Sequence, residues 1–137
     1  MLMLERLIKD RLALRPALAA WHVRGGTDVV DRSKVPAVDV RMLAAAPGDV
    51  SREVAQLEPR WACLMVTQRS STAVRELDGA MTAVIAALHN WRPVCSSGRQ
   101  WDRLKVVGVR EVEVSEAGLV GFSVEFTTVS SFDGADD

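Results

Sequence analysis

The sequence has few of the residues that bind metals or act as nucleophiles. Its 137 residues include two cysteines and two histidines, and neither Cys63 nor Cys95 belongs to a CxxC motif or to a Cys/His cluster with zinc spacing. A disulfide is not needed either, because a chain of this length removes roughly two-thirds of its surface from water on folding. We therefore expect no metal site, no structural disulfide and no bound cofactor.

Long apolar runs and an excess of positive charge are absent as well. No run approaches the ~18 apolar residues of a membrane span, and the N-terminus carries its charges inside the apolar stretch, unlike a signal peptide. The 17 basic and 18 acidic side chains give a net charge of −1, whereas a nucleic-acid-binding domain is usually strongly basic. These absences predict a cytoplasmic protein that contacts no membrane and reads no nucleic-acid sequence.

Lysine and arginine are missing from the C-terminal part of the chain. After Arg110 the sequence has no basic residue but seven acidic ones. Such an asymmetry allows the acidic end of one copy to attract the basic part of another copy or of a partner. The alternative is a solvated acidic surface followed by a tail. We predict a single domain over residues 1–129 and an acidic, flexible tail over residues 130–137.

The spacing of the apolar residues predicts two main helices. In residues 4–14 the apolar positions recur at helical intervals, and charged residues lie between them. A second and longer helix has one apolar stripe that runs from Val74 to Leu88. The side chain of Ser71 or Thr72 is predicted to cap its first turn.

The remaining segments predict a sheet. Alternation of apolar and polar residues indicates a strand over residues 38–42, which we expect to end in a loop at residues 44–49. Residues 53–69 form the longest extended segment, and its central part is apolar on both faces, which favours the middle of a sheet. Residues 21–24 allow only a short strand, and residues 94–102 predict a polar loop.

The last third of the chain predicts a β-hairpin in which the apolar residues are even-numbered. For these residues to share one face, the connecting loop must hold an odd number of residues, and residues 116–118 supply three, with Gly118 at the position that needs a positive φ. Val112 then opposes Phe122. The same register places three carboxylates together on the outer face: Glu111, Glu113 and Glu125.

No catalytic arrangement emerges from these residues. Cys95 and His89 are one pair that would offer a thiol and a base, but one cysteine in a loop and one histidine at a helix end often occur by chance. Phosphate-binding loops of the GxxxxGK[ST] or GxGxxG type are absent from the sequence. The three glutamates offer only carboxylates on a flat strand face, which does not favour a metal site. We therefore predict that the protein is not an enzyme.

Several residues are candidates for an assembly surface. Trp101 lies in a polar stretch, where it is the best candidate for an exposed interface anchor. Arg69, Arg99 and Arg103 flank predicted elements or follow the second helix, so we take them as basic partners for the acidic strand face. The alternative for each is an ordinary solvated arginine. A contact between two different surfaces of successive copies generates a ring when the rotation closes.

The segment that ends the second helix is distinctive. It reads ALHNWRP over residues 87–93, in which Asn90 tolerates the left-handed conformation of a helix C-cap and Pro93 prevents continuation of the helix. We give a structural role to Asn90, Trp91 and Pro93.

Nearly the whole order of elements resembles the tail terminator proteins of long-tailed bacteriophages. Besides the segment that ends the second helix, the resemblance rests on the Leu-rich N-terminal helix, the PAVDV strand at residues 36–40, the long strand over residues 54–68 and the hairpin that ends in Phe126-Thr127-Thr128. Members of that family often carry glycine where this chain has Asn90, and both residues suit the same backbone geometry.

The resemblance implies an α+β fold with a mixed, largely antiparallel β-sheet, two main helices packed on one face of it, and a homohexameric ring. In that family the ring sits on the last ring of the tail tube, stops polymerisation of the tail-tube protein and presents the surface that joins a head–tail connector or stopper protein. DNA passes through the ring lumen without sequence-specific binding. The implied location is the virion tail, with the host cytoplasm as the place of assembly.

Three other assignments stay open at this point. The first is a neck, head-completion or tail-completion protein of a contractile-tailed phage. The second is a small ligand-binding or thiol-dependent α+β protein that would use Cys95. The third is a dimeric domain of another role, because a fold does not by itself determine a function.

Overall fold

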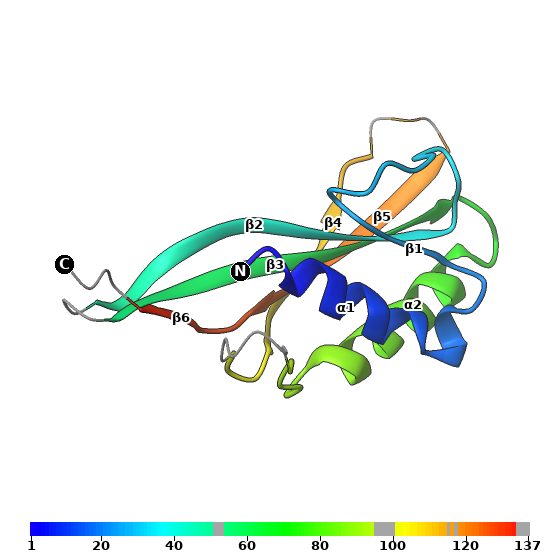
Figure 1. The fold of residues 1–137 in the computed structure, drawn as a ribbon. Helices are drawn as coiled ribbons and strands as arrows, with labels where there is room; N and C mark the ends of the chain where they lie inside the picture. Colours follow the sequence, from blue (N-terminus) through cyan, green and yellow to red (C-terminus); the bar gives the residue numbers. More distant parts are fainter. Residues whose placement is uncertain (51–53, 95–100, 115, 117, 134–137) are drawn as a thin grey trace.

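Two helices lie on one face of a twisted sheet in the computed structural model (Figure 1), which describes residues 1–50, 54–94, 101–114, 116 and 118–133. Helix α1 spans Leu4–Ala13, helix α2 spans Ala73–Leu88, and a short 3-10 helix, η1, spans Pro16–Leu18. In this part of the chain neither α-helix is long and apolar enough to cross a bilayer. The predicted α+β class is confirmed.

The sheet has six strands, and five of them follow the order β1-β2-β3-β5-β4, while β6 pairs with β3. Strands β1 and β2 are parallel, and the other pairs are antiparallel. The sheet is therefore mixed and largely antiparallel, as predicted. The strand bounds are β1 His22–Gly25, β2 Ala37–Val50, β3 Val54–Gln68, β4 Lys105–Val112, β5 Leu119–Thr127 and β6 Ser130–Asp133.

The hydrophobic core lies between the helices and the inner part of the sheet. Alternate residues of the central strands point toward the helices, among them Trp61 and Phe126, which are 1% and 0% exposed. The helical layer contributes three buried residues of α1 to the same core: Leu4, Ile8 and Leu12. The helical spacing of these three residues, which is visible in the sequence, therefore corresponds to the buried stripe of α1.

The end of α2 adopts the conformation that Asn90 suggested. Asn90 has a φ of 65°, its backbone N–H donates to the Leu104 carbonyl over 2.7 Å, and Pro93 is buried. Trp91 is half-buried, and the Arg11 guanidinium lies 4.8 Å from its ring centroid while donating to the Ala87 carbonyl. Arg11 thus satisfies a carbonyl in the last turn of α2 that has no partner within the helix.

The beginning of α2 differs from the prediction. Thr72 is the N-cap residue, but neither its side chain nor that of Ser71 makes a capping hydrogen bond to the helix backbone. The Thr72 hydroxyl instead donates to the Glu76 carboxylate over 2.9 Å. Because Thr72 has helical backbone angles, its side chain is not placed to reach the first free N–H groups.

The predicted loop at residues 44–49 is wrong, because β2 continues through it to Val50. Strands β2 and β3 pair from Ala37 opposite Val66 to Val50 opposite Ala55, with register shifts on either side of Pro47. Strand β1 reaches only as far as Val40, so the later part of β2 has β3 as its one strand neighbour in the described sheet. A proline is tolerated there because the outer side of such a strand makes no ladder bonds.

Strands β2 and β3 extend together beyond the helices (Figure 1). We call residues 44–50 and 54–58, together with β6, the ribbon. The hydrophobic core contains no described residue of its β2 and β3 segments, and each of their described side chains is half-buried or exposed. Much of these two segments is nevertheless apolar, including four alanines, Pro47 and Leu57.

The predicted flexible tail, residues 130–137, was placed to begin too early, because its first four residues form a strand. Ser130–Asp133 forms β6, which pairs with Val54–Leu57 of β3, and Ser130 also bridges to Trp101. The backbone of β3 in the ribbon offers hydrogen-bonding groups to this segment, which explains why it joins the sheet. Residues 134–137 lie outside the described residues.

The predicted register of the hairpin is also wrong, by one residue. Val112 opposes Gly121, and Glu111 opposes Phe122, although Gly118 has the expected positive φ of 85°. A Cβ atom on Gly121 would lie 3.0 Å from a Val114 methyl group. The absence of a side chain at Gly121 therefore leaves the space in which Val114 packs on the face of the sheet opposite the helices.

This register separates Glu125 from Glu111 and Glu113, although the three were predicted to lie together. Glu111 shares the helix-bearing face with Phe122, whereas Glu125 points to the other face, which we call the open face. The Glu125 carboxylate lies 3.1 Å from the Arg110 guanidinium there, and its side chain is 13% exposed. The predicted face of three adjacent carboxylates does not exist.

The helix-to-sheet packing can be tested with two leucines near the end of α1. Leu12 is fully buried, whereas Leu14 is 82% exposed. Leu12→Ala is expected to lower the free energy of unfolding by about 2–5 kcal/mol, because it leaves a cavity in the core. Leu14→Ala, the matched control, is expected to change it by less than about 0.5 kcal/mol. Urea denaturation measures both, and equal effects would contradict the described packing.

Candidate functional site

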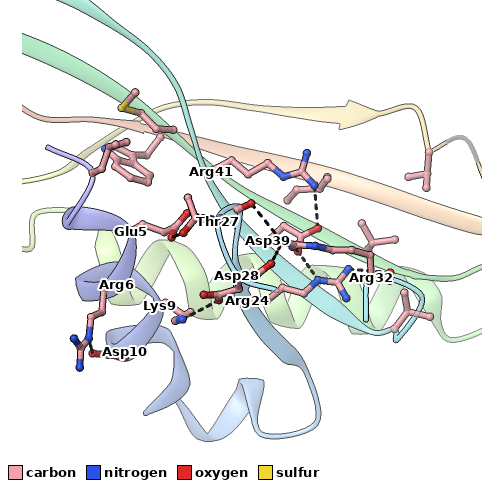
Figure 2. A pocket seen from close by; sticks show the side chains of 18 of the residues that line it. Glu5, Arg6, Lys9, Asp10, Arg24, Thr27, Asp28, Arg32, Asp39 and Arg41 are labelled. Carbon is pink, nitrogen blue, oxygen red and sulfur yellow. Dashed lines mark hydrogen bonds and ion pairs between the residues drawn. The ribbon is translucent and has the colours of Figure 1, made fainter. Parts of the chain in front are cut away.

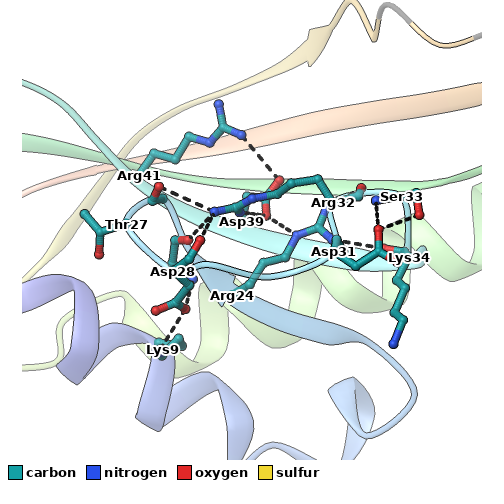
Figure 3. A network of polar contacts seen from close by, with 12 residues as sticks. Lys9, Arg24, Thr27, Asp28, Asp31, Arg32, Ser33, Lys34, Asp39 and Arg41 are labelled. Atoms are coloured by element: carbon teal, nitrogen blue, oxygen red, sulfur yellow. Dashed lines mark hydrogen bonds and ion pairs between the residues drawn. The ribbon is translucent and has the colours of Figure 1, made fainter.

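Three arginines surround one buried carboxylate on the open face (Figure 3). Arg24 of β1 donates to Asp39 of β2 through Nε, and the Nη1 of Arg32 donates to the same Asp39 oxygen over 3.1 Å. Arg41 Nη2 lies 3.6 Å from the other oxygen. The side chains of Arg24 and Asp39 are 7% and 5% exposed, so this ion pair is almost completely removed from water.

Arg24 and Arg32 also bind the segment that follows β1. The guanidinium of Arg24 donates to the carbonyls of Asp31, Arg32 and Lys34, at 3.1, 3.2 and 3.1 Å. Arg32 donates to the carbonyls of Gly25 and Asp28, at 2.9 and 2.8 Å. Because these donors are already bonded to the protein, the cluster holds residues 26–35 over the sheet instead of offering an anion site.

A large cavity of about 1170 Å³ lies beside this network, between α1, the segment after β1, and β2 (Figure 2). Its polar side chains pair with each other: Glu5 accepts from the backbone and hydroxyl of Thr27, and Lys9 donates to Asp28 over 2.8 Å. The hydrogen bond from Lys9 lowers the pKa of Asp28 most, with help from the Gly25 N–H. One ion pair and two hydrogen bonds in these walls thus link α1 to the segment after β1.

Three of the predicted interface residues lie together at the other edge of the sheet. Arg69, Glu111 and Glu113 line a hollow of about 600 Å³ near the hairpin turn. The backbone N–H of Arg69 donates to the Gly118 carbonyl over 2.7 Å. This hydrogen bond holds the residue that follows β3 against the turn between β4 and β5. Glu125 is not part of the hollow, because it lies on the open face beside Arg110.

The other predicted interface residues lie elsewhere. Trp101 is only 4% exposed, so the prediction of an exposed anchor is wrong: the indole belongs to the core, and its backbone bridges to Ser130. Arg103 is exposed and donates to the Asn90 carbonyl over 2.9 Å, which stabilises the end of α2. Arg99 lies outside the described residues.

The side chains of Cys63 and His89 have structural surroundings. Complete burial raises the pKa of the Cys63 thiol to about 12, so this sulfur stays protonated in the core. His89 Nδ1 accepts the backbone N–H of Val106 over 3.2 Å. Cys95, its potential partner, lies outside the described residues, and the described part of the chain contains no group of His, Cys, Asp and Glu that could hold a metal.

Two surfaces were not found from the sequence. One is the ribbon, and the other is an apolar groove of about 340 Å³ between the first half of α2 and β5. The sequence placed Val74 on the buried stripe of α2, but the structure leaves it 81% exposed at the rim of this groove. Helical spacing predicts which residues share a side of a helix, but it does not show how far the sheet beneath that side extends.

Comparisons with known proteins give a similarity in fold. No known family model and no curated protein matches the sequence. A solved structure of the virion of a native gene transfer agent (GTA) particle contains a chain with a similar fold, with a TM-score of 0.71 and 16% sequence identity. The alignment covers 94% of this chain and 95% of that chain.

The cluster around Asp39 makes a testable contribution to stability. Asp39→Asn keeps the shape but removes the charge that balances the buried Arg24, so it is expected to lower the free energy of unfolding by about 3–5 kcal/mol. Asp10→Asn is the matched control, because Asp10 pairs with Arg6 in an exposed position and should change stability by less than about 0.5 kcal/mol. Similar urea midpoints for the two variants would refute the structural role of Asp39.

Proposed function

We propose that this chain is a structural protein of a phage-like virion and acts there as a tail terminator. The observation that carries the proposal is the similarity to a chain of the GTA virion over nearly the full length of both chains. Because the similarity is not confined to a motif or a subdomain, it favours a whole component of such a particle. The order of elements that resembles the tail terminator family gives the specific role.

The ribbon supports an assembly role. A two-stranded hairpin is only marginally stable in water by itself, and the ribbon adds only β6 to its β2 and β3 segments. Its exposed or half-buried apolar side chains gain free energy when another protein covers them. In this proposal the ribbon reaches from the subunit onto the tail tube, and the described residues act as one domain.

Capping follows from the shape of such a subunit. A ring that matches the end of the tail tube on one side, but presents a different surface on the other, blocks the addition of further tube protein. The second surface is then available to the head–tail connector or stopper protein. DNA would pass through the lumen without sequence-specific contacts, since a chain with a net charge of −1 has no excess of basic groups to retain phosphates.

The proposal predicts a hexameric ring that is stable on the tail tube. Light scattering of the purified protein, alone and with tail-tube protein, is expected to give a ring mass of six times the 15.0 kDa of the chain. Substoichiometric amounts are expected to stop tube growth in electron micrographs, because one ring caps one tube end.

Two outcomes would contradict this function. A monomer or dimer that does not bind the tube would exclude the terminator role. A ring that leaves tube growth unchanged but binds the head connector would instead identify a neck or head-completion protein.

A further inference from the structure

The groove between α2 and β5 lies at one edge of the sheet. Helix α2 packs on β3 and β5, whereas β4 lies farther out and leaves Val107 and Val109 each 45% exposed. The apolar lining of the groove comes from both layers: Val74, Leu77, Met81, Val120 and Phe122. A grouped apolar surface of this kind is typical of a protein contact.

Acidic side chains border the groove. Asp78 and Arg69 line it directly, and Glu111 lies opposite Phe122 in the β4–β5 register. Glu113 shares the adjoining hollow with Glu111 and Arg69. Three carboxylates and one guanidinium therefore give this border a net negative charge.

The other edge of the sheet has the opposite character. It is formed by β1, on which α1 packs. Residues 4–15 contain four basic and two acidic side chains. The same helix region exposes apolar side chains at both ends: Leu2 and Met3 are 62% and 57% exposed, and Leu14 is 82% exposed.

We infer that the groove receives the α1 edge of a second copy of this chain, with Leu14 as an apolar contact. The two surfaces lie at opposite edges of one sheet, both carry exposed apolar side chains, and their charges are opposite in sign. Because the surfaces differ, the contact repeats head to tail and closes a ring when the rotation allows it. The inference rests on the proposed ring and assigns its subunit interface.

Charge substitutions on the two surfaces test the inference. Val74→Glu and Leu14→Glu are each expected to weaken self-association by about tenfold or more, because each replaces an apolar side chain of the contact with a carboxylate that must lose its water. Both positions are exposed in the subunit, and a carboxylate in the first turn of α2 interacts favourably with the helix dipole, so folding should be retained. Ala86→Glu, on an exposed position of the same helix, is the matched control and should assemble like the wild type.

A mixture of the two variants distinguishes a head-to-tail contact from a symmetric one. In Val74→Glu the α1 edge is intact, and in Leu14→Glu the groove is intact. An equimolar mixture is therefore expected to give pairs of twice the 15.0 kDa chain mass in light scattering, whereas each variant alone stays monomeric. Circular dichroism and urea midpoints equal to those of the wild type establish that both variants fold.

The outcomes separate this inference from the proposed function, since all samples are measured with and without tail-tube protein. If Val74→Glu forms rings of wild-type mass and caps the tube, the groove is not the subunit interface, although the terminator function stands. If it forms rings but no longer binds the tube, the groove belongs to the tube protein and the inference is overturned. A wild-type chain that never self-associates would overturn both.

Discussion

The antiparallel pairing of β2 with β3 is the interaction on which the rest of the structure depends. It runs from Ala37 opposite Val66 to Val50 opposite Ala55, and it has two unlike halves. The inner half carries the apolar side chains on which the helices pack, because one face of a sheet is buried only when another layer covers it. The outer half extends beyond the helices and forms the ribbon (Figure 1). One ladder thus provides both a stable body and a projecting arm.

The two edges of this sheet are chemically different, so the subunit has two unlike sides. At the β1 edge, Arg24 and Arg32 converge on Asp39 and hold residues 26–35 in place (Figure 3). The two guanidinium groups also donate to carbonyls of the segment after β1, which ties this segment to the sheet. The other edge offers the apolar groove with its acidic border. In the proposed ring, these two unlike edges of successive copies are the surfaces that meet.

The sequence predicted those parts of the fold that depend on local periodicity. Both helices, the central strand β3 and the positive φ at Asn90 are confirmed, because apolar spacing and backbone preferences determine them. The α+β class, which the resemblance to the tail terminator family implied, is confirmed as well. The path of residues 44–49 was missed, because an Ala-Pro-Gly segment has low strand propensity and becomes extended only by pairing with β3. The hairpin register depended on the space above Gly121, which is a tertiary contact with Val114.

Of the candidate site, the sequence placed Glu111 and Glu113 on one strand, but it did not place Arg69 beside them. It misplaced Glu125 and Trp101, whose surroundings depend on register and on β6. Amide hydrogen exchange in the free protein and in its complex with tail-tube protein tests directly whether the ribbon is covered on assembly. In the free protein, the amides of residues 44–46, 48 and 54–58 are expected to exchange faster than those of residues 61–66, and in the complex they are expected to become protected about tenfold or more. Equal protection of the ribbon in both states would contradict its role as the arm that assembly covers.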